Sequence, residues 1–301
     1  MLFRSRGQSI VKICEPDHAT LRAALAGSLE AVDALITAIQ PGIYKLAVHV
    51  LGNRDDAADA SQEILLKVIT HLSGFRAESA FATWVWRVAY NHLMTARTRK
   101  AESPEVSLEG IADRLEQGLE FSARLAHDRG EPGPLSPQDK LEARQVALAC
   151  TQSMLMALDR EQRLAYVIDT VFDLDSREAA AVVGISPEAY RQRLSRARSR
   201  LDAFMSKACG LANTDAACRC ERQLPTVRHM AKVRGPDSGA VVALHKSELD
   251  EAERQFAAFT RLSDAAAILR AHPDYRAPEA QRAAILAVLR QEGFMQREQP
   301  Q

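Results

Sequence analysis

Residues 176–201 read SREAAAVVGISPEAYRQRLSRARSRL, and this stretch decides the fold of the second half of the chain. Ser176 is placed to cap a short helix, Gly184 permits the positive φ of a tight turn, and Ile185 fits the angle between two helices. Ser186 then caps a second helix, which has Pro187 at its first position. The pattern therefore predicts a helix-turn-helix.

The second helix of this motif has one apolar face and one polar, basic face. Its apolar residues recur at helical spacing, so they are predicted to pack on the first helix. In a helix-turn-helix the opposite face enters the major groove of DNA, where it contacts base edges and phosphates. A solvated amphipathic helix is the alternative, but it does not explain the glycine turn. The apolar face carries Tyr190, Leu194, Ala197 and Leu201, and the predicted DNA-binding face carries Ser186, Glu188, Arg191, Gln192, Ser195, Arg196 and Arg198.

The distribution of charge supports a nucleic-acid partner, although the net charge is zero with 39 basic and 39 acidic residues. Residues 186–207 contain six basic and two acidic residues, whereas residues 101–140 contain nine acidic and four basic ones. An anionic partner docks where positive charge is concentrated, so this segregation is more informative than the total.

The whole chain favours helices, and we expect an all-α fold. Aromatic residues make up only 5% of the sequence, while helix-forming residues are abundant. Residues 101–138 differ, because they are acidic, hold four of the twelve prolines and lack sustained apolar periodicity. This segment is predicted to be a linker with one weak helix near residues 108–119. The other helices are expected at about residues 19–39, where Pro41-Gly42 interrupts the pattern, and at 44–51, 56–71, 79–99, 139–158, 161–172, 241–271 and 278–291.

Two segments before the linker resemble a known family. Residues 56–67, DAADASQEILLK, resemble the D-x-x-D-x-x-Q-E helix of region 2 of bacterial sigma factors. Residues 74–93, GFRAESAFATWVWRVAYNHL, resemble the F-R-G-E-S-x-F-x-T-W-L-x-R-I-A-x-N run of that region. With the helix-turn-helix further on, the chain resembles RNA polymerase sigma factors of the sigma-70 family, extracytoplasmic-function (ECF) type.

The resemblance implies a factor that binds core RNA polymerase and directs promoter-specific transcription initiation. Region 2, residues 19–100, would dock on the clamp helices of the largest polymerase subunit and capture a flipped base of the melted −10 element. Region 4, residues 139–207, would contact the flap of the second large subunit and read the −35 element through the face described above. The implied polymerase-binding residues are Asp56, Asp59, Gln62, Glu63 and Lys67, and the implied −10 residues are Phe75, Arg76, Ser79, Ala80, Phe81, Arg87 and Asn91.

Two positions depart from the family pattern. Thr95 stands where the family often has an acidic residue, and Ala77 where it has glycine, so the preferred −10 bases stay open. Trp84 is expected to fill the core. For Trp86 and Tyr90 two interpretations stay open: stacking on DNA, or an ordinary surface position.

Residues 208–301 form an extension for which a regulatory role is a candidate. Cysteine and histidine are the preferred ligands of zinc, and four of them can close a tetrahedral site. The spacing Cys-x8-Cys-x-Cys is not a standard zinc spacing, so a zinc site, a redox switch and inert thiols all stay open. No cofactor is expected to be required. The candidate residues are Cys209, Cys218, Cys220 and His229, and a later apolar stripe holds Phe256, Phe259, Leu262, Ala266 and Leu269.

Two other functions are weighed against this interpretation. A regulator that binds duplex operators without polymerase would have no use for the single-strand pocket implied by residues 74–91. An enzyme that uses the cysteines is disfavoured because no Ser/His/Asp set, paired carboxylates or Gly-rich phosphate loop accompanies them.

The N-terminal residues lack the apolar run of a signal peptide, and no stretch approaches about 18 apolar residues. We therefore expect a cytoplasmic protein without membrane insertion, whose five cysteines are not structural disulfides. Whether a separate anti-sigma protein exists stays open.

Overall fold

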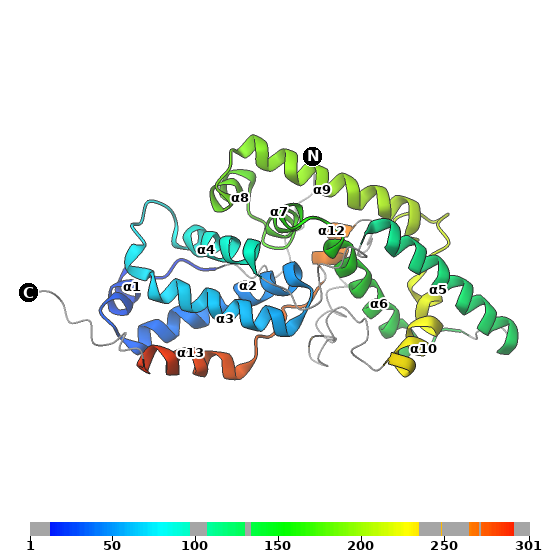
Figure 1. The fold of residues 1–301 in the computed structure, drawn as a ribbon, viewed down its shortest axis with the longest axis horizontal. Coiled ribbons are helices and arrows are strands. Elements are labelled where there is room, and N and C mark those ends of the chain that lie inside the picture. The colour runs from blue at the N-terminus through cyan, green and yellow to red at the C-terminus, as the bar shows by residue number, and fades with distance from the viewer. Residues whose placement is uncertain are drawn as a thin grey trace, which may run out of the picture.

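The computed structural model describes residues 13–96, 107–129, 134–234, 248, 265–270 and 272–291. Every regular element in these ranges is a helix, so the all-α prediction is confirmed. One isolated bridge joins Cys209 and Cys218. Figure 1 shows a first group of helices at one end of the molecule and a second group beside it. The first group comprises α1 (His18–Leu25), α2 (Leu29–Leu51), α3 (Arg54–Thr70), the 3-10 turn η1 (Leu72–Gly74) and α4 (Phe81–Thr95).

Helix α2 runs without a break through Pro41, so the expected interruption at Pro41-Gly42 is wrong. The chain breaks earlier, at Gly27, whose φ of 88° is favourable only for glycine. A proline inside a helix costs about 3 kcal/mol. Ile39 and Ile43 on either side of it are fully buried, and each such side chain contributes about 1.5–3 kcal/mol. Burial of the helix therefore outweighs the local cost of the proline.

The length and apolar character of α2 also correct the expectation that no stretch of the chain approaches the length and composition of a membrane span. By those two criteria alone it is long and apolar enough to cross a membrane, and it is the one such helix among the described residues. However, 72% of its most apolar window is buried inside the protein. The helix is therefore a core helix, which α3 covers along most of its length (Figure 1).

The second group contains the predicted helix-turn-helix. Gly184 has a φ of 77°, and the Ser186 hydroxyl accepts a hydrogen bond from the Ala189 amide, as predicted. The cap of the first helix is Asp175 rather than Ser176, because Asp175 forms a capping box with Glu178. The group comprises α6 (Pro137–Met156), α7 (Arg160–Thr170), α8 (Ser176–Val183) and α9 (Pro187–Ala208).

The acidic segment contains a longer helix than predicted. Helix α5 spans Leu108–Arg129, and it packs against the turn η2 (Cys220–Gln223) and helix α10 (Leu224–Arg234) of the extension. The Thr226 hydroxyl donates to the Gly118 carbonyl at 2.6 Å, and the Gln223 amide donates to the Leu115 carbonyl at 2.8 Å. The sequence did not reveal this helix fully, because its partner lies about a hundred residues away.

The other described helices of the extension lie across both groups. Helix α12 (Ala265–Arg270) packs against α6, α7 and α9, and α13 (Glu279–Gln291) packs against α2 and α3. In α13, Ile285 and Leu289 are fully buried, and the Gln281 amide donates to the Ala58 carbonyl at 2.7 Å. Phe256, Phe259 and Leu262 of the predicted stripe, and most of the helix expected at 241–271, lie outside the described residues.

A buried polar seam joins the two groups. The Arg163 guanidinium is 2% exposed and donates to the Val50 carbonyl of α2 at 2.6 Å, and also to three carbonyls at the end of α6. The Gln152 side chain contacts the His49 ring at 3.2 Å and donates to the His49 carbonyl at 3.0 Å. Because buried polar groups are costly unless they are paired, these bonds fix how the two groups meet.

Candidate nucleic-acid interface

Helix α9 presents its predicted reading face to solvent. All seven residues predicted for DNA binding are exposed, and the four apolar residues of the opposite face are buried. The Tyr190 hydroxyl donates to the Ala165 carbonyl at 2.8 Å and so anchors α9 on α7. The helix is therefore held rigidly while its basic side remains open.

Two arginines of this face carry ion pairs. Arg191 contacts Glu188 one turn earlier at 2.7 Å, and Arg198 contacts Asp169 of α7 at 2.5 Å. Burial raises the pKa of Asp169, while the Arg198 charge lowers it. Arg198 is therefore tethered to the protein, whereas Arg191 is held only within its own exposed turn.

Five of the seven predicted −10 residues lie in the loop before α4 or at its first position, whereas Arg87 and Asn91 lie further along the helix. The Phe75 ring packs edge-on against Phe81 at 5.5 Å and lies 5.7 Å from Trp84, so an aromatic cluster supports the loop. Phe81 is buried, whereas the other members of the set are exposed or half-buried. The exposed or half-buried members are Phe75, Arg76, Ser79, Ala80, Arg87 and Asn91.

The two tryptophans of α4 take different places from those expected. Trp84 is only half-buried, whereas Trp86 is 4% exposed and packs on Phe172 with ring centroids 4.6 Å apart. Gly42 allows this, because a Cβ there would stand 3.2 Å from the Trp86 ring. Tyr90 is 7% exposed and its hydroxyl lies 3.4 Å from Arg193. Trp86 therefore fills the junction between the groups.

Sequence reasoning missed two residues that position α4. The Glu15 carboxylate accepts hydrogen bonds from the Phe81 and Ala82 amides at 2.9 Å each, so it caps a helix whose own N-cap, Ala80, has no capping side chain. At the other end Arg160 donates to the carbonyls of Leu93, Met94 and Ala96. Both contacts link residues more than 60 positions apart, so no local pattern could have revealed them.

The predicted polymerase-binding residues do not all share one surface. Asp59, Glu63 and Lys67 are exposed on α3, and Gln62 is half-buried, whereas Asp56 is buried near the start of the helix. The Lys67 ammonium lies 2.8 Å from the His92 ring. The exposed face is therefore continuous from Asp59 to Lys67 without Asp56.

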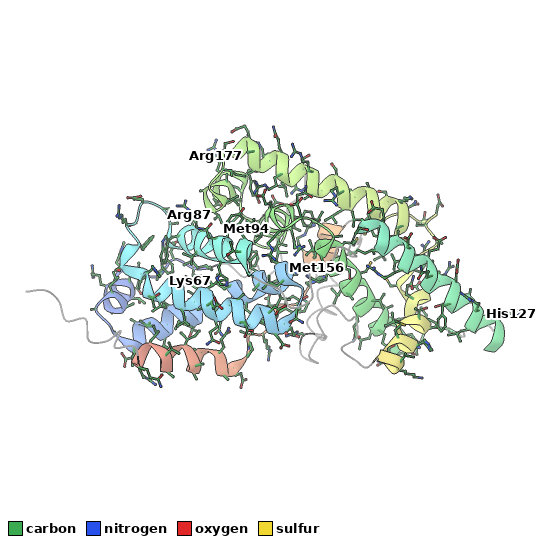
Figure 2. All side chains as sticks on the ribbon, viewed as in Figure 1. Lys67, Arg87, Met94, His127, Met156 and Arg177 are labelled. Carbon is green, nitrogen blue, oxygen red and sulfur yellow. The ribbon has the colours of Figure 1, made fainter. Side chains whose placement is uncertain are left out.

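The structure brings α4 into direct contact with the helix-turn-helix. The Arg87 guanidinium donates to the Ala181 carbonyl of α8 at 2.7 and 3.2 Å. Figure 2 shows Arg87 on the side of α4 that faces α8. A residue of the predicted −10 set is thus bonded to another helix of the protein, although its side chain remains exposed.

The cysteines of the extension lie together, but His229 is not with them. Cys209, Cys218 and Cys220 line one pocket, whereas the His229 ring stacks on Phe121 at 4.8 Å and does not line it. Burial raises the pKa of the Cys220 thiol and, less strongly, that of Cys218. Cys150 of α6, which the sequence did not single out, lines the same pocket, and burial raises its pKa to about 12.

The described geometry is that of a helical DNA-binding protein of the helix-turn-helix class, with a second candidate site on α4. Residues 35–102 match the family Sigma-70 region 2, and residues 148–201 match Sigma-70, region 4. The chain therefore belongs to the sigma-70 family, in its ECF group. It directs promoter-specific transcription initiation with core RNA polymerase, and its partners are that polymerase and promoter DNA.

Three curated relatives illustrate the similarity. The RNA polymerase sigma-H factor of Pseudomonas aeruginosa is 27% identical, over 62% of this chain and 93% of the relative. The ECF RNA polymerase sigma factor SigW of Bacillus subtilis is 26% identical, over 58% and 89%. The RNA polymerase sigma factor CnrH of Cupriavidus metallidurans is 29% identical, over 50% and 73%. A solved structure of CnrH in complex with the cytosolic domain of CnrY is 22% identical and covers 63% of this chain and 97% of that chain, with a TM-score of 0.42.

Proposed function

We propose that α4 and the loop before it capture an unstacked base of the −10 strand, while the exposed face of α9 reads the −35 duplex. The observation that supports this most directly is the pairing of a supported aromatic loop at Phe75 with an open basic face on α9. An unstacked base needs aromatic or apolar walls and a polar edge reader, and Asn91 is exposed on the same helix. The protein is proposed to act without catalysis of its own, in the cytoplasm.

The α3 face that carries the exposed residues Asp59, Glu63 and Lys67 and the half-buried Gln62 is proposed to dock on the clamp helices of polymerase, with region 4 on the flap. Acidic side chains one turn apart on an exposed helix can meet a basic partner surface. The acidic segment that contains α5 is proposed to occupy the nucleic-acid path of polymerase, because negative charge suits a basic channel.

The test of base capture is Asn91→Ala. The variant is expected to bind core polymerase normally but to form open complexes about tenfold less, as measured by permanganate reactivity of the −10 thymines. The control is Gln291→Ala, which removes an exposed side-chain amide at the end of α13. Normal melting by Asn91→Ala would refute the proposed pocket.

The described arrangement is proposed to be a closed state that must open on a promoter. The −35 and −10 elements are separated by about 25 base pairs, or about 85 Å at 3.4 Å per pair. In the protein Arg87 of the −10 set contacts α8 of the helix-turn-helix directly, at 2.7 Å. One molecule cannot occupy both elements in this form, so the contact between α4 and α8 has to break.

The extension is proposed to stabilise this closed state, because it bonds to both groups. The His272 ring contacts the Thr151 hydroxyl of α6 at 2.9 Å, and Lys45 of α2 pairs with Asp274. Ile285→Glu would place a charge in the fully buried face of α13 and should release that helix. We expect faster initiation in a single-round assay than with Ala283→Glu, which adds the same charge on the exposed face. Equal rates for the two variants would contradict a restraining role.

A further inference from the structure

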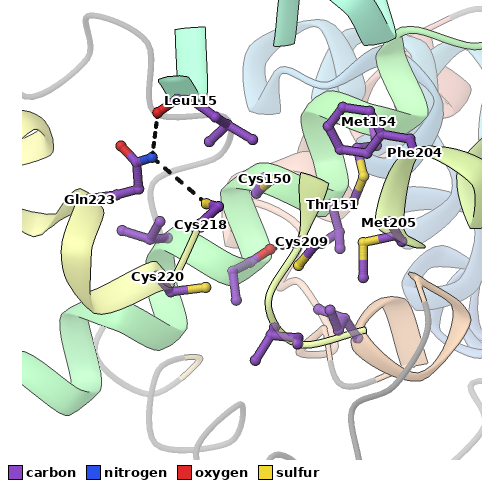
Figure 3. Close-up of a pocket in the computed structure, with 14 residues that line it drawn as sticks. Leu115, Cys150, Thr151, Met154, Phe204, Met205, Cys209, Cys218, Cys220 and Gln223 are labelled. Carbon is purple, nitrogen blue, oxygen red and sulfur yellow. Dashed lines mark hydrogen bonds between the residues drawn. The ribbon is translucent and has the colours of Figure 1, made fainter. Parts of the chain in front are cut away.

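Four of the five cysteines of the chain line one pocket, although they come from separate segments (Figure 3). Cys150 lies on α6, Cys209 is the C-cap of α9, and Cys218 and Cys220 lie just before and at the start of η2. The fifth, Cys14, is exposed near the N-terminus and does not line the pocket. The cluster therefore arises from the tertiary structure and not from one sequence motif.

The backbone fixes the spacing of two of these thiols. Cys209 and Cys218 are partners in an isolated bridge, and the Gly210 amide donates to the Cys218 carbonyl at 3.0 Å. A Cβ at Gly210 would overlap both that carbonyl and the Arg219 guanidinium, so only glycine fits there. The Gln223 amide also contacts the Cys218 sulfur at 3.7 Å. The loop is thus built to hold its cysteines close to α6.

Apart from Thr151 and Gln223, the rest of the pocket wall is apolar, with Met154, Phe204 and Met205 beside the thiols (Figure 3). Such a wall excludes water and suits a soft ion more than a hydrated hard one. Packing alone would need only small apolar side chains at these four positions. One disulfide would join only two of the sulfurs, whereas a single tetrahedral ion joins all four.

We propose that Cys150, Cys209, Cys218 and Cys220 together bind one thiophilic d10 metal ion, Zn²⁺ or Cu⁺, through sulfur alone. Zinc would displace one proton from each of the four thiols and leave a site of net charge −2, with Zn–S bonds of about 2.3 Å. The Arg219 guanidinium, which donates to the Cys218 carbonyl at 2.9 Å, lies close enough to offset part of that charge.

Among the residues that the structure describes, no group of three or more His, Cys, Asp and Glu side chains is placed to hold a metal ion, so metal binding at this pocket requires the cysteine side chains to move. Closing the site requires the sulfurs to turn inward about their Cα–Cβ bonds. The ion would then tie α6 of region 4, the end of the recognition helix and the start of α10 together. This inference does not depend on the assignment of the DNA-binding residues.

The experiment uses full-length protein, reduced and free of oxygen. In one arm Zn²⁺ is titrated against a chromophoric chelator, and in the other Cu⁺ is titrated against bicinchoninate. We expect one ion per chain in at least one arm. Cys150→Ser, Cys209→Ser, Cys218→Ser and Cys220→Ser should each lower the affinity at least 100-fold, while Cys14→Ser and His229→Asn should bind as the wild type does.

X-ray absorption of the metal-loaded wild type provides a measurement that needs no variant to fold. A first shell of sulfur alone is expected, and a nitrogen or oxygen ligand would overturn the assignment. No binding of either ion would also overturn it. Retention of the ion by Cys150→Ser together with its loss from His229→Asn would overturn the proposal. It would show that the three cysteines of the extension bind the ion with the histidine as the fourth ligand.

Discussion

The predicted reading face of α9 and the proposed capture site on α4 differ in how ready they are for DNA. Every predicted contact residue of α9 is exposed, and the helix needs no rearrangement to enter a major groove. On α4, Phe81 is buried and Arg87 is bonded to Ala181 of the neighbouring helix. A duplex can be read by a rigid preformed surface. Capture of a melted strand at the proposed site, by contrast, would require the contacts between α4 and the neighbouring helix to break.

This contrast has an energetic reason. The contacts that close α4 against region 4 include the Arg160 bonds to the end of α4 and the Trp86–Phe172 ring contact. Hydrogen bonds to charged groups contribute about 1.5–3 kcal/mol each, so the proposed opening would have a cost that polymerase and promoter must offset. A ligand shifts such an equilibrium only by its differential affinity for the open state.

The largest expected effect concerns polymerase binding by region 2. Asp59→Lys with Glu63→Lys should weaken the affinity for core polymerase about 100-fold, or about 3 kcal/mol, because both exposed carboxylates would become repulsive. Fluorescence anisotropy with labelled protein measures this. Asp215→Lys with Glu279→Lys in the extension makes the same charge change at other exposed positions and should cost much less. If the two double variants behave alike, the α3 face is not the docking surface.

A second effect concerns the seam that keeps the two regions together. Burial, aided by the Lys45 charge, lowers the pKa of His49 to about 3, and burial also lowers that of His272. Below pH 6.5 these two histidines bind protons in the unfolded chain but not in the folded chain, so the free energy of unfolding falls as the pH drops from 6.5 towards 3. At pH 5 the loss for His49 is about 2 kcal/mol.

Urea unfolding at pH 7.5 and pH 5 measures this loss. His49→Gln should reduce the difference in unfolding free energy between the two pH values, whereas His18→Gln at an exposed position should leave it unchanged. A pH dependence in His49→Gln as steep as in the wild type would show that the seam does not titrate in this way.

The smallest expected effect separates two arginines on α9. Arg191→Ala should cost about 1–3 kcal/mol on the preferred −35 sequence and relax base preference there. Arg198→Ala, which removes the partner of Asp169, should weaken all duplexes alike and reduce the salt dependence by about one phosphate contact. Binding to a randomised −35 library at two salt concentrations measures both. Equal and uniform losses from the two variants would place the reading residues elsewhere on α9.

The sequence by itself determined the helical class, the helix-turn-helix and the two regions of the family. Those features depend on short-range chemistry: a glycine with positive φ at Gly184, a capping hydroxyl at Ser186 and apolar spacing along α9. The same local rules failed at Pro41, because the free energy of burying α2 exceeds the intrinsic penalty for proline in a helix.

Only the tertiary structure decided how the regions meet and which side chains they share. Glu15 caps α4 across 66 residues, Arg163 joins α7 to the end of α2, and Cys150 comes to lie with the cysteines of the extension. None of these contacts has a periodicity or motif, since each joins segments that are distant in the chain. Long-range pairing follows from the packing of whole helices, and for that reason it could not be predicted from any single stretch of residues.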